Sequence, residues 1–337
     1  MGMKKLLLIP SVSILLLSSC GPDTHNDKYR DLIRPGKANV ILVTGQSNAS
    51  GNSPWEFLQS KNPTIYNKFK NGVTNVLTSH YVQDGRCYEY FEPTRFGLAD
   101  HDSLFGPEVG IADVFSETNG FTYIIKFAVG GTRLYNDWLD SHGQRGRLYN
   151  DSVDWFKKRL EYLKSRGVEP NIVGQFWMQG EGDSTDEWGS VYGSNLKNMI
   201  SFYREDLEDY YQNHYTFVDA YISTKTVWPN PKLVNEQKQM VADSDPYVYC
   251  IKTNGEDETA INLDVKCHSG EGEDAAHYDS QSEVLLGQRA GQIIRENLWK
   301  NRGIRGFFLF SEWFSRLLVT CNKCWYKWGY NSNCNCA

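Results

Sequence analysis

The chain has 337 residues, of which 23% are charged and 40% are hydrophobic, with a formal net charge of −6 at pH 7. This composition is typical of a globular protein with one or two domains, and it argues against a disordered chain, a collagen-like repeat and a multi-span membrane protein. The acidic balance argues against a nucleic-acid partner. The sequence contains neither a G-x-x-x-x-G-K phosphate loop nor an H-E-x-x-H zinc motif.

The first 20 residues have the features of an export signal. Two lysines precede an apolar run from Leu6 to Leu17, which is short for a membrane span, and Ser18, Ser19 and Cys20 follow. This segment resembles a bacterial lipoprotein signal, in which the cysteine receives lipid and becomes the new N-terminus. We therefore expect residues 1–20 to be a lipoprotein signal peptide and Cys20 to anchor an exported protein to a membrane, in the periplasm or on the cell surface. A plain secretory signal that ends near a cysteine is the alternative.

Residues 21–37 are polar and indicate a tether, and from residue 38 short apolar runs alternate with amphipathic stretches. Strands alternating with helices predict an α/β domain over 38–302, a three-layer α/β/α sandwich around a mostly parallel sheet. The apolar runs predict buried strands at 39–44, 122–129, 172–178, 216–222 and 247–251, and helical spacing predicts helices at 152–164, 196–211, 232–242 and 282–299.

Two segments depart from this alternation. Residues 49–105 are rich in Asn, Ser, Gly and aromatic residues, and we interpret them as a long insertion of loops and short strands that shapes a substrate cleft. Residues 303–337 form a tail rich in aromatic residues and cysteines. A disulfide knot in an exported protein and a gene-boundary artefact both fit this tail, so we assign it no function.

Candidate active-site residues follow two of the predicted strands, at the carboxyl edge of the sheet, where the active sites of parallel sheets lie. Gly45-Gln46-Ser47-Asn48 comes after the first strand, where Ser47 can present an exposed hydroxyl. An ordinary turn in which Ser47 or Asn48 caps a helix is the alternative. Gly130 and Gly131 come after the second strand. Glycines let a backbone N–H approach an oxyanion closely, and a simple tight turn is the alternative.

Two later segments complete the candidate site. Gln179 and Glu181 follow the strand predicted at 172–178. The glutamine amide can donate to an oxyanion, and the glutamate can bind a histidine, bind sugar hydroxyls or cap a helix. Asp274 lies three residues before His277. An acid at this spacing can hold the Nδ1–H of the histidine and leave Nε2 to accept a proton from a serine, although a surface histidine is the alternative.

Together and in this order, these segments resemble the conserved blocks of the SGNH hydrolase superfamily. More narrowly, the segments resemble the sialate O-acetylesterase-like branch of this superfamily, which includes the acetylxylan esterases of carbohydrate esterase family 6. The resemblance covers about residues 38–300 and implies an SGNH, flavodoxin-like sandwich. The matching blocks are Gly45–Asn48, Gly106–Glu108, Gly130–Thr132 with Trp138, Trp177–Asp183 and Asp274–His277.

The resemblance implies a role for each catalytic residue. Ser47 would be the nucleophile, His277 the general base and then the general acid, and Asp274 the residue that orients His277. Some relatives use the glutamate of the third strand's block for this purpose, so Glu181 competes with Asp274. The oxyanion hole would comprise the N–H groups of Ser47 and Gly131 and the amide of Gln179.

Further expectations concern the rim of the site. We expect Arg133 and Trp138 to lie near the rim and contact sugar, and Gly106-Pro107-Glu108 to begin a helix. The implied chemistry needs no metal and no organic cofactor.

The resemblance predicts a serine esterase that removes O-acetyl groups from carbohydrates, of the acetylxylan or sialate type, through an acyl-enzyme. The expected partners are an acetylated carbohydrate and, through the lipid anchor, a membrane. Two alternatives remain open. One is a lipase or thioesterase on the same scaffold, and the other is a surface lipoprotein that binds glycans without catalysis.

Overall fold

The computed structural model describes residues 27–81, 87–225 and 227–301. Its centre is a seven-stranded sheet with the order β4-β3-β6-β1-β7-β8-β9, in which β4 pairs antiparallel to β3 and the other pairs are parallel. The strands are β1 (Gly36–Gly45), β3 (Val73–Tyr81), β4 (Cys87–Thr94), β6 (Thr122–Ala128), β7 (Val168–Met178), β8 (Thr216–Ala220) and β9 (Val248–Ile251). A separate two-stranded sheet pairs β2 (Ser53–Pro54) with β5 (Leu104–Phe105).

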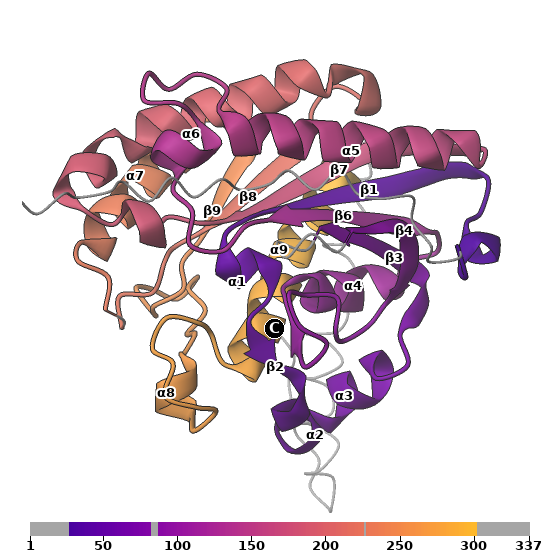
Figure 1. The fold of residues 1–337 in the computed structure, drawn as a ribbon, viewed down its shortest axis with the longest axis horizontal. Helices are drawn as coiled ribbons and strands as arrows, with labels where there is room; N and C mark the ends of the chain where they lie inside the picture. The colour runs from indigo at the N-terminus through magenta and orange to yellow at the C-terminus, as the bar shows by residue number, and fades with distance from the viewer. Residues whose placement is uncertain (1–26, 82–86, 226, 302–337) are drawn as a thin grey trace, which may run out of the picture.

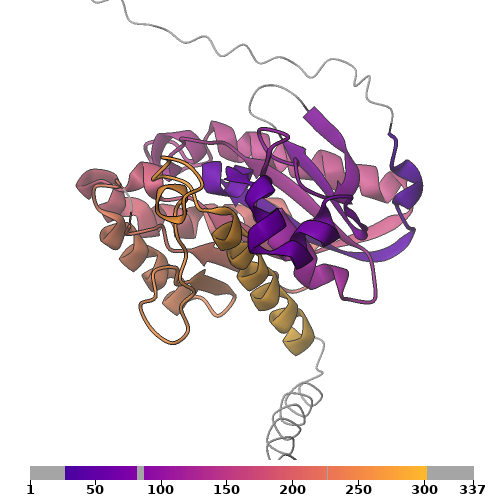
Figure 2. The same cartoon turned by 90° about the horizontal axis from the view of Figure 1, so that it is seen from below.

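Helices cover both faces of the sheet (Figures 1 and 2). On one face lie α5 (Arg147–Ser165), α6 (Asp186–Asp206) and α7 (Pro231–Ser244), and on the other α4 (Glu108–Ser116) packs against α9 (Ser280–Asn301). The short helices are α1 (Ser47–Ser50), α2 (Leu58–Lys61), α3 (Pro63–Phe69), α8 (Lys266–Ser269), η1 (Arg30–Leu32), η2 (Trp55–Phe57), η3 (Leu134–Trp138), η4 (Glu181–Asp183) and η5 (Glu208–Tyr210). Among the described residues, no helix is both long and apolar enough to span a membrane.

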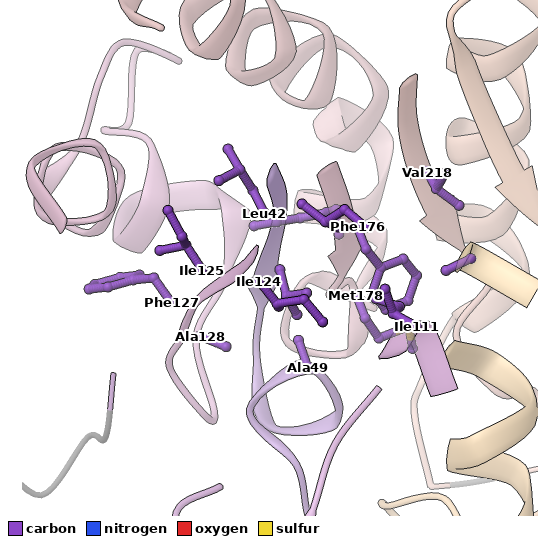
Figure 3. Packing of buried hydrophobic residues seen from close by; sticks show 14 of the residues in the cluster. Leu42, Ala49, Ile111, Ile124, Ile125, Phe127, Ala128, Phe176, Met178 and Val218 are labelled. Carbon is purple, nitrogen blue, oxygen red and sulfur yellow. The ribbon is translucent and has the colours of Figure 1, made fainter. Parts of the chain in front are cut away.

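The core lies on both sides of the central strands. Residues 40–43 of β1 are fully buried, as the continuous apolar run predicts for a parallel strand covered on both faces. Figure 3 shows Leu42 and Ile125 on one side of the sheet, and Ile124 on the other side close to Ala49, which belongs to α1. The short helix after β1 is therefore fixed against the sheet, at the carboxyl ends of β1, β6 and β7.

The structure confirms the α/β sandwich, the five predicted strands and the four predicted helices, although α6 begins ten residues before its predicted start at 196. The interpretation of 49–105 as an insertion was wrong in part, because β3 and β4 belong to the central sheet. The tether predicted at 21–37 extends too far toward the domain, since Ile33 packs in the core and β1 begins at Gly36. The predicted signal peptide, Cys20 and the 303–337 tail lie outside the described residues.

Candidate active site

The turn that carries Ser47 is held between two neighbouring strands. Gly45 ends β1 with a φ of +138°, and a Cβ added there would lie 2.0 Å from the Met178 carbonyl oxygen, so only glycine fits. The Gln46 N–H donates to the same Met178 carbonyl at 2.9 Å, and the Val129 N–H donates to the Gly45 carbonyl at 3.0 Å. These contacts place Ser47 at the carboxyl edge of the sheet, between the residues that follow β6 and those that follow β7.

Ser47, His277 and Asp274 form a continuous hydrogen-bonded chain. Ser47 Oγ lies 2.8 Å from His277 Nε2, and His277 Nδ1 lies 2.6 Å from Asp274 Oδ2. The Ala276 N–H donates to Asp274 Oδ1 at 2.8 Å, which fixes the carboxylate within its own loop. Lys266 Nζ lies 2.7 Å from Asp274 Oδ2. Although burial alone would raise the pKa of Asp274, hydrogen bonds from Lys266, His277 and the Ala276 N–H hold it well below its usual range.

The competing acid is in a different position. Glu181 is 3% exposed, and its Oε1 accepts a hydrogen bond from Asn48 Nδ2 at 2.8 Å. Burial raises the pKa of Glu181 above its usual value. The imidazole Nδ1 of His277 contacts Asp274, so the geometry favours Asp274 as the acid that orients His277.

Two backbone N–H groups are the predicted oxyanion donors. Ser47 is the first residue of α1, where an N–H has no partner within the helix. Gly131 adopts a φ of +70°, and a Cβ added there would meet no atom within 4 Å, so its backbone borders open space. This arrangement suits the predicted use of both N–H groups as oxyanion donors.

The predicted third donor is already engaged. Gln179 is fully buried, and its Nε2 donates to Asp183 Oδ2 at 2.7 Å and to the Thr132 carbonyl at 3.1 Å. The Tyr192 hydroxyl donates to Gln179 Oε1 at 3.1 Å and so fixes the amide orientation. In this conformation neither amide hydrogen is free for an oxyanion. The contacts instead give Gln179 the task of holding Thr132, which directly follows Gly131.

The prediction that Trp138 contacts sugar at the rim was wrong. Trp138 is fully buried, and its ring packs edge-on against Trp177 at 4.9 Å between centroids. Its Nε1 donates to Thr132 Oγ1 at 3.0 Å. The indole is therefore a core group that supports the Gly130–Thr132 turn from below.

Arg133 does lie at the accessible side of this turn. Its guanidinium carbon is 4.2 Å from the centroid of the Trp188 ring, and the Tyr135 ring also stacks on Trp188, with 6.2 Å between centroids. Its Cγ would lie 3.1 Å from a Cβ added to Gly182, beside Glu181. No carboxylate among the described residues forms an ion pair with this partly exposed cation.

Sequence reasoning missed two residues that contact the triad or its supports. Lys266 binds Asp274, and no local pattern in the sequence marks it. Asn48 follows Ser47 in a segment that the sequence did single out, but only as a helix cap. Within residues 27–81, 87–225 and 227–301, no cluster of His, Cys, Asp and Glu side chains is arranged to hold a metal ion.

The sequence matches the family described as carbohydrate esterase, sialic acid-specific acetylesterase, over residues 37–296. The chain belongs to this family. It is a carboxylic ester hydrolase of the carbohydrate acetylesterase type. The resemblance inferred from the sequence blocks is thereby confirmed at the level of the family.

Solved structures agree with the fold. A protein from Arabidopsis thaliana is 17% identical with a TM-score of 0.56, and the match covers 77% of this chain and 98% of that chain. NanS is 16% identical with a TM-score of 0.57, and the match covers 80% of this chain and 99% of that chain. At such identities the likeness concerns the fold alone. A search of curated protein sequences found no match.

Proposed function

We propose that this protein removes O-acetyl groups from acidic, sialic-acid-type sugars through an acyl-enzyme on Ser47. The observation that carries the proposal is the unbroken chain from Ser47 Oγ through His277 to Asp274, at 2.8 Å and 2.6 Å. A serine becomes a nucleophile when a base accepts its proton and a third group orients that base. The family described as sialic acid-specific supports the class of substrate.

The proposed reaction has two halves. Ser47 Oγ attacks the acetyl carbonyl carbon while His277 Nε2 takes the hydroxyl proton, and the backbone N–H groups of Ser47 and Gly131 stabilise the oxyanion. The C–O bond to the sugar then breaks, and His277 returns the proton to the departing sugar oxygen. In the second half His277 takes a proton from the water that attacks the acetyl carbon. The bond from this carbon to Ser47 Oγ then breaks, His277 returns the proton to Ser47 Oγ, and acetic acid leaves and ionises to acetate.

Acetate release by the purified protein tests the serine esterase. p-Nitrophenyl acetate serves as the general substrate, and Ser47→Ala and His277→Ala serve as paired variants. Hydrolysis in the wild type that disappears in both variants is the expected result. A folded wild type without activity would contradict the esterase and favour a binding protein, whereas activity in Ser47→Ala would contradict the choice of nucleophile.

Arg133 is the group that we propose selects an acidic sugar. Its guanidinium stacks on Trp188 at 4.2 Å and has no carboxylate partner among the described residues. A planar guanidinium binds a carboxylate through two parallel hydrogen bonds, and its stacking on Trp188 holds the plane of the guanidinium in place. We therefore expect the carboxylate of the sugar to bind Arg133 while the acetyl group lies at Ser47.

A comparison of two substrates tests this specificity. Arg133→Met should raise KM for an O-acetylated sialic acid by about 10-fold or more, the loss expected for one charged hydrogen-bonded contact, and leave KM for a neutral acetylated xylo-oligosaccharide nearly unchanged. Arg166→Met, at the opposite end of the sheet after α5, is the matched control. Equal effects on both substrates would refute selection by charge.

We also propose that the protein is exported and carries lipid on Cys20. The support is the order of lysines, apolar run, small residues and cysteine in the sequence. Metabolic labelling with a fatty acid should label the wild type and not Cys20→Ser, which should leave the membrane fraction. Labelling of the variant, or a soluble wild type, would contradict the anchor.

A further inference from the structure

We propose that Asn48 is a positioning residue that fixes His277 against Ser47, and that Glu181 holds the Asn48 amide in its working orientation. The proposal rests on the proposed serine esterase and assigns Glu181 a task other than that of triad acid. It concerns a residue next to the nucleophile whose side chain points away from the reaction and into the protein.

Three segments meet at the Asn48 side chain. Its Nδ2 donates to Glu181 Oε1 at 2.8 Å and lies 3.5 Å from the Ala276 carbonyl oxygen, while its Oδ1 accepts from the Tyr278 N–H at 3.3 Å. Ala276 and Tyr278 flank His277 on either side. One amide therefore contacts the backbone before and after the catalytic histidine, and it starts from the residue directly after the nucleophile.

Burial makes this link stiff. Asn48 is 2% exposed and belongs to α1, which packs against the ends of three strands. The loop that carries His277 lies between α8 and α9, outside the central sheet. Such a loop depends on side-chain contacts for its position, because no strand ladder with the main sheet fixes it. The Asn48 amide supplies contacts on both sides of His277.

Glu181 decides which way the amide points. An asparagine side chain can exchange its oxygen and nitrogen by a half-turn, and only one orientation matches an N–H donor at Tyr278. Glu181 Oε1 acts as an acceptor toward Nδ2 and so selects that orientation. Glu181 Oε2 has no hydrogen-bond partner among the described residues, whereas Oε1 is engaged by Asn48.

The consequence for catalysis is geometric. The Ser47–His277 distance of 2.8 Å suits proton transfer, and a displacement of about 1 Å costs on the order of 100-fold in rate. Without the Asn48 link, the loop carrying His277 keeps Asp274 as its own partner, because that contact is local to the loop. The histidine remains correctly oriented but is no longer held at the serine.

Four variants of the full protein separate this role from a purely structural one. For p-nitrophenyl acetate, Asn48→Ala and Glu181→Ala should lower kcat by about 10- to 100-fold with KM changed less than about 3-fold. Glu181→Gln should lose less than about 5-fold, because a glutamine oxygen still accepts from Asn48. Asn235→Ala is the matched control, since Asn235 is 5% exposed and bridges both backbone groups of Ile222 in the same manner.

The control should lose thermal stability and keep kcat. The inference is overturned if Asn48→Ala keeps kcat, or if Glu181→Gln falls as far as Glu181→Ala, which is the result expected of a triad acid. If Asn48→Ala does not fold, the Glu181→Ala and Glu181→Gln pair gives the same decision. A wild type inactive toward acetyl esters overturns the proposed function instead, which keeps the two failures distinguishable.

Discussion

A buried ion pair beneath the nucleophile turn gives the sharpest test of the energetics. Lys126 lies in the middle of β6, and its Nζ is 2.9 Å from Glu108 Oε2, with side-chain exposures of 1% and 0%. The same ammonium group donates to the Ser50 carbonyl at 2.7 Å and to the Leu98 carbonyl. We therefore expect Lys126→Met to leave one buried carboxylate without its counter-charge and two buried carbonyls without a donor.

The cost follows from these contacts. Removing one partner of a buried pair destabilises a protein by about 3–5 kcal/mol, since an uncompensated charge remains. For a domain of this size the corresponding fall in Tm is about 5–9 °C. Chemical denaturation of wild type and Lys126→Met, followed by circular dichroism, measures the difference directly.

A second variant tests the cause. Glu108→Gln removes the charge and keeps an acceptor for the Gly106 N–H, which donates to Glu108 Oε1 at 2.9 Å. The double variant Lys126→Met/Glu108→Gln should therefore be more stable than Lys126→Met alone. A loss below about 1 kcal/mol for the single variant would refute the reasoning. A double variant whose loss of unfolding free energy equals the sum of the losses in the two single variants would refute it as well.

Three further predictions follow from the site. Asp274→Asn should lower kcat by on the order of 10⁴ with little change in KM, because His277 loses the acceptor that fixes its tautomer; steady-state kinetics measure this. Trp138→Ala should cost about 3–5 kcal/mol in unfolding free energy and should not change KM for sugar substrates selectively, as expected for a core residue. Burial raises the pKa of Asp183 to about 6, above its value in the unfolded chain. Its contribution to stability is therefore complete below about pH 4 and lost as the pH rises through about 6. Asp183→Asn should lack that part of the decline in unfolding free energy. Parallel curves of unfolding free energy against pH for the wild type and Asp183→Asn, from pH 4 to pH 7, would contradict a raised pKa for Asp183.

The central strands could be predicted because a strand that is buried on both faces has a continuous run of apolar residues, as in residues 40–43 of β1. β3 was missed because it buries Thr78 and Ser79, residues that suggest a loop when seen in sequence. Thr78 Oγ1 pairs with Thr94 Oγ1 at 2.8 Å across to β4, and only the folded sheet reveals that partner. The early start of α6 did carry a signal, since the Thr185 side chain caps it.

The triad could be predicted from the resemblance of its sequence blocks to a known family, and from the three-residue spacing of Asp274 and His277, which makes their contact local. The environment of each candidate could not. Whether the Gln179 amide is free depends on Thr132 and Asp183, one of which is 47 residues away along the chain. Trp138 illustrates the same limit, since an indole in a segment that follows a strand can contact a sugar or fill the core, and the sequence does not distinguish the two.

Two buried lysines explain how irregular turns persist at this edge of the sheet. Where strands end and turn sharply, backbone carbonyls lose their ladder partners, and leaving them unpaired in the interior is costly. Lys126 serves the Ser50 and Leu98 carbonyls, and Lys238 on α7 serves those of Gln179 and Ala220.

Each of these ammonium groups is balanced by one buried acid, Glu108 for Lys126 and Asp219 for Lys238. The two pairs lie under different parts of the site, one below the nucleophile turn and one below the Gln179–Glu181 turn. A lysine is usually exposed, whether in a strand like Lys126 or in a helix like Lys238, so neither pair could be predicted from the sequence. The precision of the site thus depends on charges that never touch the substrate.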